Sequence, residues 1–131
     1  MKNSKVVTSY LVVAGIVGIV VGGANLITPI AFNASSGIDL KDNLNLINEM
    51  RATGGGLLGS SLVIFLGAFI GRLRFSSVLL SVMIYLGYGL GRCLSILLDS
   101  MPSEEMTQIV IFELIVGVVG LYVFIKYKEK F

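Results

Sequence analysis

Charged side chains inside long apolar segments are the residues of this sequence best placed to do chemistry. Arg92 lies six residues before Leu98, where its apolar segment ends, and Glu113 lies six residues after Thr107, where another begins. At a helical rise of about 1.5 Å per residue, both lie about 9 Å inside their segments. An unpaired charge in an apolar medium costs at least roughly 2.5–3.5 kcal/mol, so we expect these two to pair or to reach water. The pair is either a structural ion pair that joins two helices or part of a binding site.

Further polar residues occur towards the same end of the apolar segments. Arginine suits ligand binding there, because its planar guanidinium binds carboxylate or phosphate through two hydrogen bonds and stays charged when partly buried. The first hypothesis is that Arg51 and Arg92 contact an anion or a lipid head group. The alternative is that the charges have only a structural role, capping the helix ends and joining neighbouring helices. The candidate ligand-binding residues are Asn25, Glu49, Arg51, Arg92, Ser95, Asp99 and Glu113, with Glu49, Asp99 and Glu113 as partners of the arginines.

Several kinds of chemistry find little support in the residue types. The chain has no histidine, the commonest general base at neutral pH, and its one cysteine, Cys93, excludes an intrachain disulfide. There is no glycine-rich phosphate loop and no metal-ligand spacing, so we expect no cofactor, no metal and no catalytic residue. A formal charge of +2 without a basic patch argues against nucleic acid as a partner.

Composition indicates a membrane protein. Of the 131 residues, 55% are hydrophobic and 14% are charged, with a mean hydropathy of +0.90. A bilayer core of about 30 Å needs roughly 20 consecutive apolar residues in a helix. Four such runs occur, and they predict one all-α transmembrane domain over residues 1–131, an integral membrane four-helix bundle. The predicted spans are residues 6–28, 52–71, 76–98 and 107–125.

The break between the first two spans is the longest. Pro29 opens it, and the run of residues 33–37, Asn-Ala-Ser-Ser-Gly, favours a turn. In its second half Leu40, Leu44 and Ile47 recur at helical spacing, with polar residues between them. This pattern predicts a short surface helix in the first outer loop.

Lysine and arginine set the expected orientation, because cytoplasmic flanks retain them. Seven of the ten basic residues lie on one side, and the six acidic residues of the intervening loops and helix ends lie on the other. Both termini are therefore predicted to be cytoplasmic. The seven are Lys2, Lys5, Arg72, Arg74, Lys126, Lys128 and Lys130; the six are Asp39, Asp42, Glu49, Asp99, Glu104 and Glu105.

Small and polar residues recur at steps of three and four in every span, which predicts helix interfaces built by close backbone approach. Gly87 and Gly91 form an additional small-residue pair in the third span. We expect these stripes to face inward, with a polar chamber open to the outside above a cytoplasmic half of glycines and aliphatics. The stripes are Gly15, Gly18, Gly22, Asn25; Glu49, Thr53, Gly56, Ser60, Gly67, Gly71; Tyr85, Tyr88, Arg92, Ser95, Asp99; and Glu113, Gly117, Gly120.

Three stretches together resemble a known family. They are residues 49–52 (Glu-Met-Arg-Ala) with the glycines at 54–56, residues 91–95 (Gly-Arg-Cys-Leu-Ser) with Asp99 and Pro102, and residues 112–114 (Phe-Glu-Leu). The chain resembles, over nearly its whole length, the bacterial four-span membrane proteins known as domain of unknown function 4345. The resemblance implies a multi-pass protein of the bacterial inner membrane and a shared polar site. It implies no particular activity.

Three functions follow from these patterns. The first is binding of a small polar or anionic ligand, a lipid head group or a membrane-protein partner in the outward-facing chamber. The second is transport by a homo-oligomer, with Glu113 as a proton carrier. The third is catalysis on a lipid by paired carboxylates and arginines, for which the residues offer the weakest support. The sequence leaves the ligand, the oligomeric state and the physiological process open.

Overall fold

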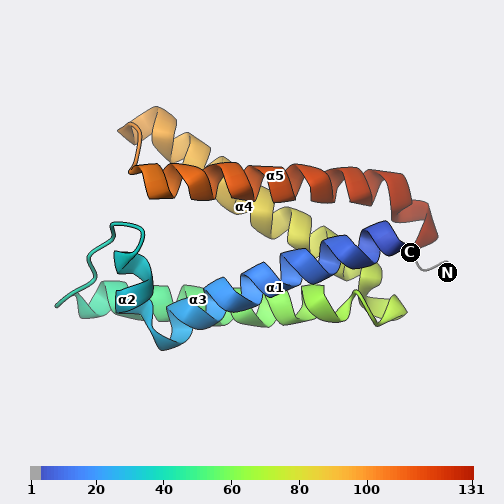
Figure 1. Ribbon diagram of the computed structural model, residues 1–131, viewed down its shortest axis with the longest axis horizontal. Coiled ribbons are helices and arrows are strands. Elements are labelled where there is room, and N and C mark those ends of the chain that lie inside the picture. The colour runs from blue at the N-terminus through green and yellow to red at the C-terminus, as the bar shows by residue number, and fades with distance from the viewer. Residues whose placement is uncertain (1–3) are drawn as a thin grey trace.

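The computed structural model describes residues 4–131, and this part of the chain is helical with no strand (Figure 1). The all-α prediction is therefore confirmed. Three of the long helices, α1, α3 and α5, begin at side-chain caps, since Ser4, Asn43 and Ser103 each accept a hydrogen bond from a backbone N–H three residues later. The elements are α1 (Lys5–Ile27), α2 (Pro29–Ala34), α3 (Leu44–Leu66), η1 (Gly71–Leu73), α4 (Arg74–Asp99), α5 (Glu104–Tyr127) and η2 (Lys128–Lys130).

Three stretches of the described chain are long and apolar enough to cross a membrane. They are Lys5–Ile27, Gly71–Asp99 and Glu104–Lys130, which correspond to α1, α4 and α5 with their adjoining 3-10 turns. The helix α3 has the same 23-residue length as α1. Its first turns, however, carry polar and charged side chains, among them Asn45, Glu49 and Arg51.

The second predicted span is displaced from the helix that the structure contains. The helix α3 begins eight residues before the predicted start at 52 and ends five residues before the predicted end at 71. No separate helix forms around residues 40–47, because residues 44–51 are the first turns of α3. The short helix of this loop is α2 instead, which starts at Pro29. Hydropathy finds where an apolar run begins, whereas the cap at Asn43 decides where the helix begins.

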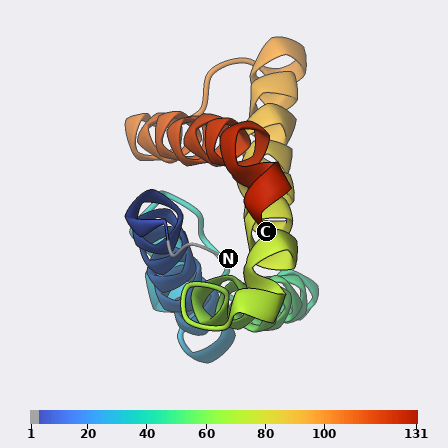
Figure 2. The same ribbon diagram turned by 90° about the vertical axis from the view of Figure 1, so that its right-hand side faces the viewer.

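The helices form two antiparallel hairpins, α1 with α3 and α4 with α5 (Figures 1 and 2). We call the end of the molecule where α1 begins and α5 finishes the terminal end. The opposite end, with α2 and the connections 35–43 and 100–103, is the loop end. The hairpins lie close together near the terminal end and diverge towards the loop end (Figure 1).

Glycine brings α1 and α3 into backbone contact. A Cβ atom on Gly22 would lie 2.6 Å from the backbone nitrogen of Leu58, and one on Gly54 would lie 2.6 Å from that of Leu26. Real Cβ atoms do not approach so closely, so no larger residue fits at either position without a shift of the backbone. The whole predicted stripe of α1 is buried, and it consists of Gly15, Gly18, Gly22 and Asn25.

The predicted stripe of α3 is wrong at three of its six positions, whereas Gly67 is buried as predicted and Thr53 and Ser60 are half-buried. Glu49, Gly56 and Gly71 are exposed, and the buried residues within α3 are Gly54, Ser61 and Ile64. Three consecutive glycines at 54–56 allow several faces to satisfy the same small-residue spacing. Only the shape of α1 selects the face that contains Gly54.

The α4–α5 pair follows the prediction on one helix only. Glu113, Gly117 and Gly120 of α5 are buried as predicted. Gly87 and Gly91 of α4, predicted to pack, are exposed with open space around them.

Gly89 is the glycine of α4 that packs, since a Cβ there would lie 2.8 Å from a Leu114 side-chain methyl. The outer part of the predicted α4 stripe, Tyr88, Ser95 and Asp99, is also exposed. Its inner residue, Tyr85, is buried.

The backbone contact predicts that Gly22→Ala destabilises the protein while Gly23→Ala does not. A methyl group at 22 meets the backbone of α3, and such overpacking costs about 1–3 kcal/mol. At Gly23 nothing lies within 4 Å, and alanine favours the helix by up to about 1 kcal/mol. Thermal unfolding of both variants in detergent measures this, and equal midpoints for the two would contradict the assigned interface.

Candidate functional site

Arg92 and Glu113 are in direct contact between α4 and α5. The Nε of Arg92 donates to Oε1 of Glu113 at 2.8 Å. The Glu113 side chain is 11% exposed, whereas the Arg92 side chain is 33% exposed. Next to this pair, towards the terminal end, Leu114 lies over Gly89 and Leu86 lies over Gly117, so the two helices are close enough for a short contact. The structure thus joins the two charges that the sequence predicts to pair.

The pair retains unused hydrogen-bonding capacity. Oε2 of Glu113 is buried and has no hydrogen-bond partner among residues 4–131. Arg92 uses only its Nε, and no residue in the described chain accepts a hydrogen bond from its Nη atoms. The ring of Tyr88, one helical turn away, lies 5.9 Å from the guanidinium carbon. The exposed arginine of such a pair can still donate hydrogen bonds to an anion, whereas the buried Oε2 is closed to solvent.

Ser95 and Asp99 are hydrogen-bonded to each other, and within the described residues neither forms a hydrogen bond or ion pair with Arg92 or Glu113. The Ser95 hydroxyl donates to Asp99 Oδ2 at 3.3 Å, one turn along α4, and both residues are exposed. Their position at the end of α4 places them at the loop end of the molecule. They are available at the surface, but no hydrogen bond among residues 4–131 links them to Arg92.

Asn25 has a structural contact. It is buried, and its side-chain oxygen accepts a hydrogen bond at 2.8 Å from Asn33 Nδ2, which also donates to the Pro29 carbonyl at 2.8 Å. These bonds fasten α2 back onto the end of α1. Asn33, expected only as a turn residue, is therefore one half of a buried amide pair.

Arg51 and Glu49 do not partner each other or the other candidates. Nη1 of Arg51 donates to the carbonyls of Leu26 and Ile27, which are exposed at the C-terminus of α1. Cations satisfy such terminal carbonyls and interact favourably with the helix dipole. Glu49 is exposed, and no residue of the described chain pairs with it. The predicted partnership of Glu49 with an arginine is thus not formed, and Arg51 joins α3 to α1.

Arg74 is a buried charged residue whose sequence position predicts only a flanking cytoplasmic charge. It is 3% exposed, and it donates to the Gly67 carbonyl at 3.3 Å, the Ala68 carbonyl at 2.7 Å and the Thr8 hydroxyl at 3.2 Å. Its guanidinium therefore links α1, the end of α3 and the start of α4. The spacing of Arg74, Ser77, Ser81 and Tyr85 on one face of α4 is the sequence signal that could have revealed it.

Polar contacts also join the two hairpins near the terminal end. Tyr85 donates to the Ala14 carbonyl at 2.6 Å and Tyr10 to the Val116 carbonyl at 3.3 Å. The Ser81 hydroxyl lies 3.0 Å from the Tyr10 hydroxyl. The expectation of a terminal half containing almost only glycines and aliphatics is therefore wrong. Single hydroxyls spaced through apolar runs barely change hydropathy, yet each requires a partner when buried.

Comparison with known proteins places this site in a family context. Over residues 6–124 the sequence matches the family described as Domain of unknown function (DUF4345). The chain belongs to this family. The matched range covers all five helices apart from a few terminal residues, so the Arg92–Glu113 site and the Arg74 contacts both lie within it. No curated protein and no solved structure gives a match.

Removing one member of the pair should destabilise the protein more than removing both. Arg92→Met leaves Glu113 buried without its one cation, and breaking a buried pair in this way costs about 3–5 kcal/mol. Adding Glu113→Leu removes the stranded carboxylate and should recover most of the loss, because apolar residues can replace a buried ion pair. Thermal unfolding of both single variants and the double variant measures the coupling. If the losses simply add, the two residues do not depend on each other.

Proposed function

We propose that the protein crosses the bacterial inner membrane four times, with α3 as the fourth span and both termini in the cytoplasm. The helix α3 has 23 residues, about 34 Å at 1.5 Å per residue, enough to cross the apolar layer. It also packs antiparallel along most of α1, which is long and apolar enough to span by itself. The charge bias supports the orientation, because basic residues flank the terminal end and acidic residues the loop end.

Cysteine labelling tests this topology. In a Cys93→Ser background, Lys41→Cys should react with a membrane-impermeant maleimide in intact cells, since residue 41 lies at the loop end. Lys128→Cys, at the terminal end, should react only after permeabilisation. Both positions are exposed, so differences in reactivity report sidedness rather than burial. Labelling of residue 128 alone in intact cells would invert the orientation, and labelling of both would indicate either insertion in both orientations or a helix α3 that does not span.

We further propose that the protein binds a small molecule or lipid head group carrying a carboxylate or phosphate at Arg92. The supporting observation is that the Arg92–Glu113 pair uses only one of the three guanidinium nitrogens of Arg92. Glu113 holds the guanidinium through Nε, and the Nη atoms remain free on a side chain that is one-third exposed. A guanidinium fixed in this way presents its planar edge to an anion through two hydrogen bonds.

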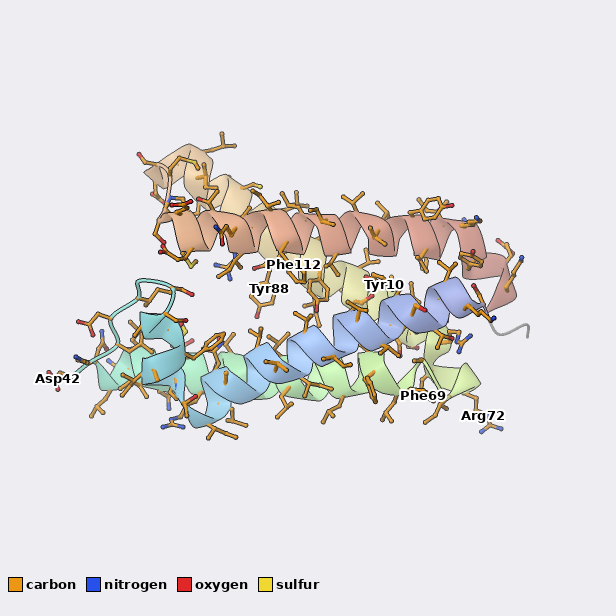
Figure 3. The ribbon with its side chains drawn as sticks, in the orientation of Figure 1. Tyr10, Asp42, Phe69, Arg72, Tyr88 and Phe112 are labelled. Carbon is orange, nitrogen blue, oxygen red and sulfur yellow. The ribbon has the colours of Figure 1, made fainter. Side chains whose placement is uncertain are left out.

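The surroundings of Arg92 support a ligand of mixed polarity. Tyr88 and Phe112, 40% and 41% exposed, extend from the α4–α5 hairpin into the region between α5 and α1 (Figure 3). The hairpins diverge on this side towards the loop end (Figure 1). Aromatic side chains beside a charged group are typical of small-molecule sites, where apolar walls accompany a few polar contacts.

Transport by a homo-oligomer is the second candidate, and one observation favours it. Buried polar groups continue from Glu113 towards the terminal end, at Tyr85, Ser81, Tyr10 and finally Arg74. This series supplies polar groups where a dry barrier was expected. Glu113 would then carry a proton between two accessible states. Catalysis on lipid is the third candidate, and no contact at the site favours it over the other two.

Soluble anions test the binding proposal. Glycerol 3-phosphate, inorganic phosphate and acetate are titrated against the purified protein, with choline chloride as the control for ionic strength. At least one of the anions should raise the unfolding temperature. For the same rise in unfolding temperature, the Arg92→Met/Glu113→Leu variant should require at least about ten-fold more anion, because a hydrogen bond to a charged group is worth about 1.5–3 kcal/mol.

Two further variants sharpen this test. Arg51→Met is the matched control, because Arg51 is the other arginine at the loop end and its Nη1 contacts only backbone carbonyls. It should keep the parental response, and Arg92→Lys should respond weakly, since an ammonium lacks the planar fork. A parent that none of the anions stabilises, or a double variant that responds like the parent, would contradict the proposal.

A further inference from the structure

We propose that a groove between α1 and α5 at the terminal end binds one anionic phospholipid, with an acyl chain in the groove and the phosphate at Lys5. The proposal uses the membrane-spanning arrangement but does not depend on a ligand at Arg92. It concerns a separate surface, at the opposite end of the helices from the Ser95–Asp99 contact.

The groove has an apolar wall on each side and a polar mouth. Its volume is about 540 Å³, within the range of small-molecule sites. Val13 and Val119, on opposite walls, are 56% and 45% exposed, so the groove opens sideways where a bilayer would lie. Its lining consists of Lys5, Val6, Ser9, Tyr10, Val13 and Ala14 of α1 and Ile115, Val116, Val119 and Val123 of α5.

The length of the groove matches one leaflet. From Lys5 to Ala14 the α1 wall rises through nine residues, about 14 Å at 1.5 Å per residue. Half of a hydrocarbon core of about 30 Å is about 15 Å. An acyl chain that starts at the level of Lys5 would therefore lie along the groove for the depth of its own leaflet. The hydrogen bond from Tyr10 to the Val116 carbonyl crosses between the two walls and satisfies the polar groups beneath the chain.

Charge selects the head group. Lys5 forms no ion pair within the described chain, and among the residues that line the groove it is the charged one. A phosphate without a compensating amine fits this end better than a zwitterionic head group. A second copy of the chain fits worse, because copies oriented alike in a membrane would bring lysines against lysines.

Native mass spectrometry of the intact protein tests the proposal. The protein is released from micelles that contain equal amounts of phosphatidylglycerol and phosphatidylcholine with identical acyl chains. Phosphatidylglycerol adducts should exceed phosphatidylcholine adducts by about five-fold, the factor for about 1 kcal/mol contributed by one lysine near an anionic surface. Lys5→Gln should bring the ratio close to one. Lys128→Gln removes a charge at the same end but outside the groove, and it should keep the ratio.

Filling the groove separates this site from general attraction to the basic end. Val119→Trp should reduce the adducts of both lipids several-fold, whereas Val20→Trp, at an exposed α1 position outside the groove, should not. Unfolding temperatures confirm that each variant is folded. Equal retention of both lipids by the parent, equal effects of Lys5→Gln and Lys128→Gln, or unchanged adducts in Val119→Trp would overturn the proposal. So would a parental dimer that Val119→Trp dissociates, which would identify the groove as a protein interface.

Discussion

The backbone contact between α1 and α3 is the constraint on which the rest of the structure depends. Gly22 and Gly54 face the opposing backbone at distances that admit no side chain. In an apolar solvent there is little hydrophobic drive between helices, so close packing and hydrogen bonds must hold them together. The same contact brings Arg51 to the carbonyls at the end of α1. It also carries the polar first turns of α3 alongside an apolar helix.

Polar contacts then decide how the two hairpins are joined. At the terminal end Arg74, Tyr10, Ser81 and Tyr85 connect α1, α3, α4 and α5 through buried hydrogen bonds. At the loop end the described contact between the hairpins is the weaker one from the Ser103 hydroxyl to the Ser36 carbonyl, at 3.5 Å. This asymmetry holds the molecule together at one end and leaves Arg92 partly exposed nearer the other.

Two buried charged groups among residues 4–131 have an atom with unmet hydrogen-bonding capacity. Nη1 of Arg74 and Oε2 of Glu113 are buried atoms without a partner. The Arg74 guanidinium is enclosed, and its other nitrogens hold three acceptors, which is the arrangement of a structural link. Glu113 instead contacts an arginine whose remaining donors are free and accessible. This difference is why we assign ligand binding to the Arg92 pair and a structural role to Arg74.

The sequence by itself determined the properties that depend on each residue's own transfer free energy and spacing. It determined the all-helical class, the positions of α1, α4 and α5, and the buried faces of α1 and α5. It also determined the juxtaposition of Arg92 with Glu113, because two opposite charges in apolar runs have few alternative partners. It did not determine the start of α3, which a side-chain cap sets, or the choice of Gly54 and Gly89 over Gly56 and Gly91. Several faces of a glycine-rich helix satisfy the same spacing, and only the surface of the partner helix selects one. The spacing of Arg74 with Ser77, Ser81 and Tyr85 indicates a shared helix face, but the acceptors of Arg74 required the tertiary structure, since folding brings the Thr8 hydroxyl of α1 and the carbonyls at the end of α3 to its guanidinium.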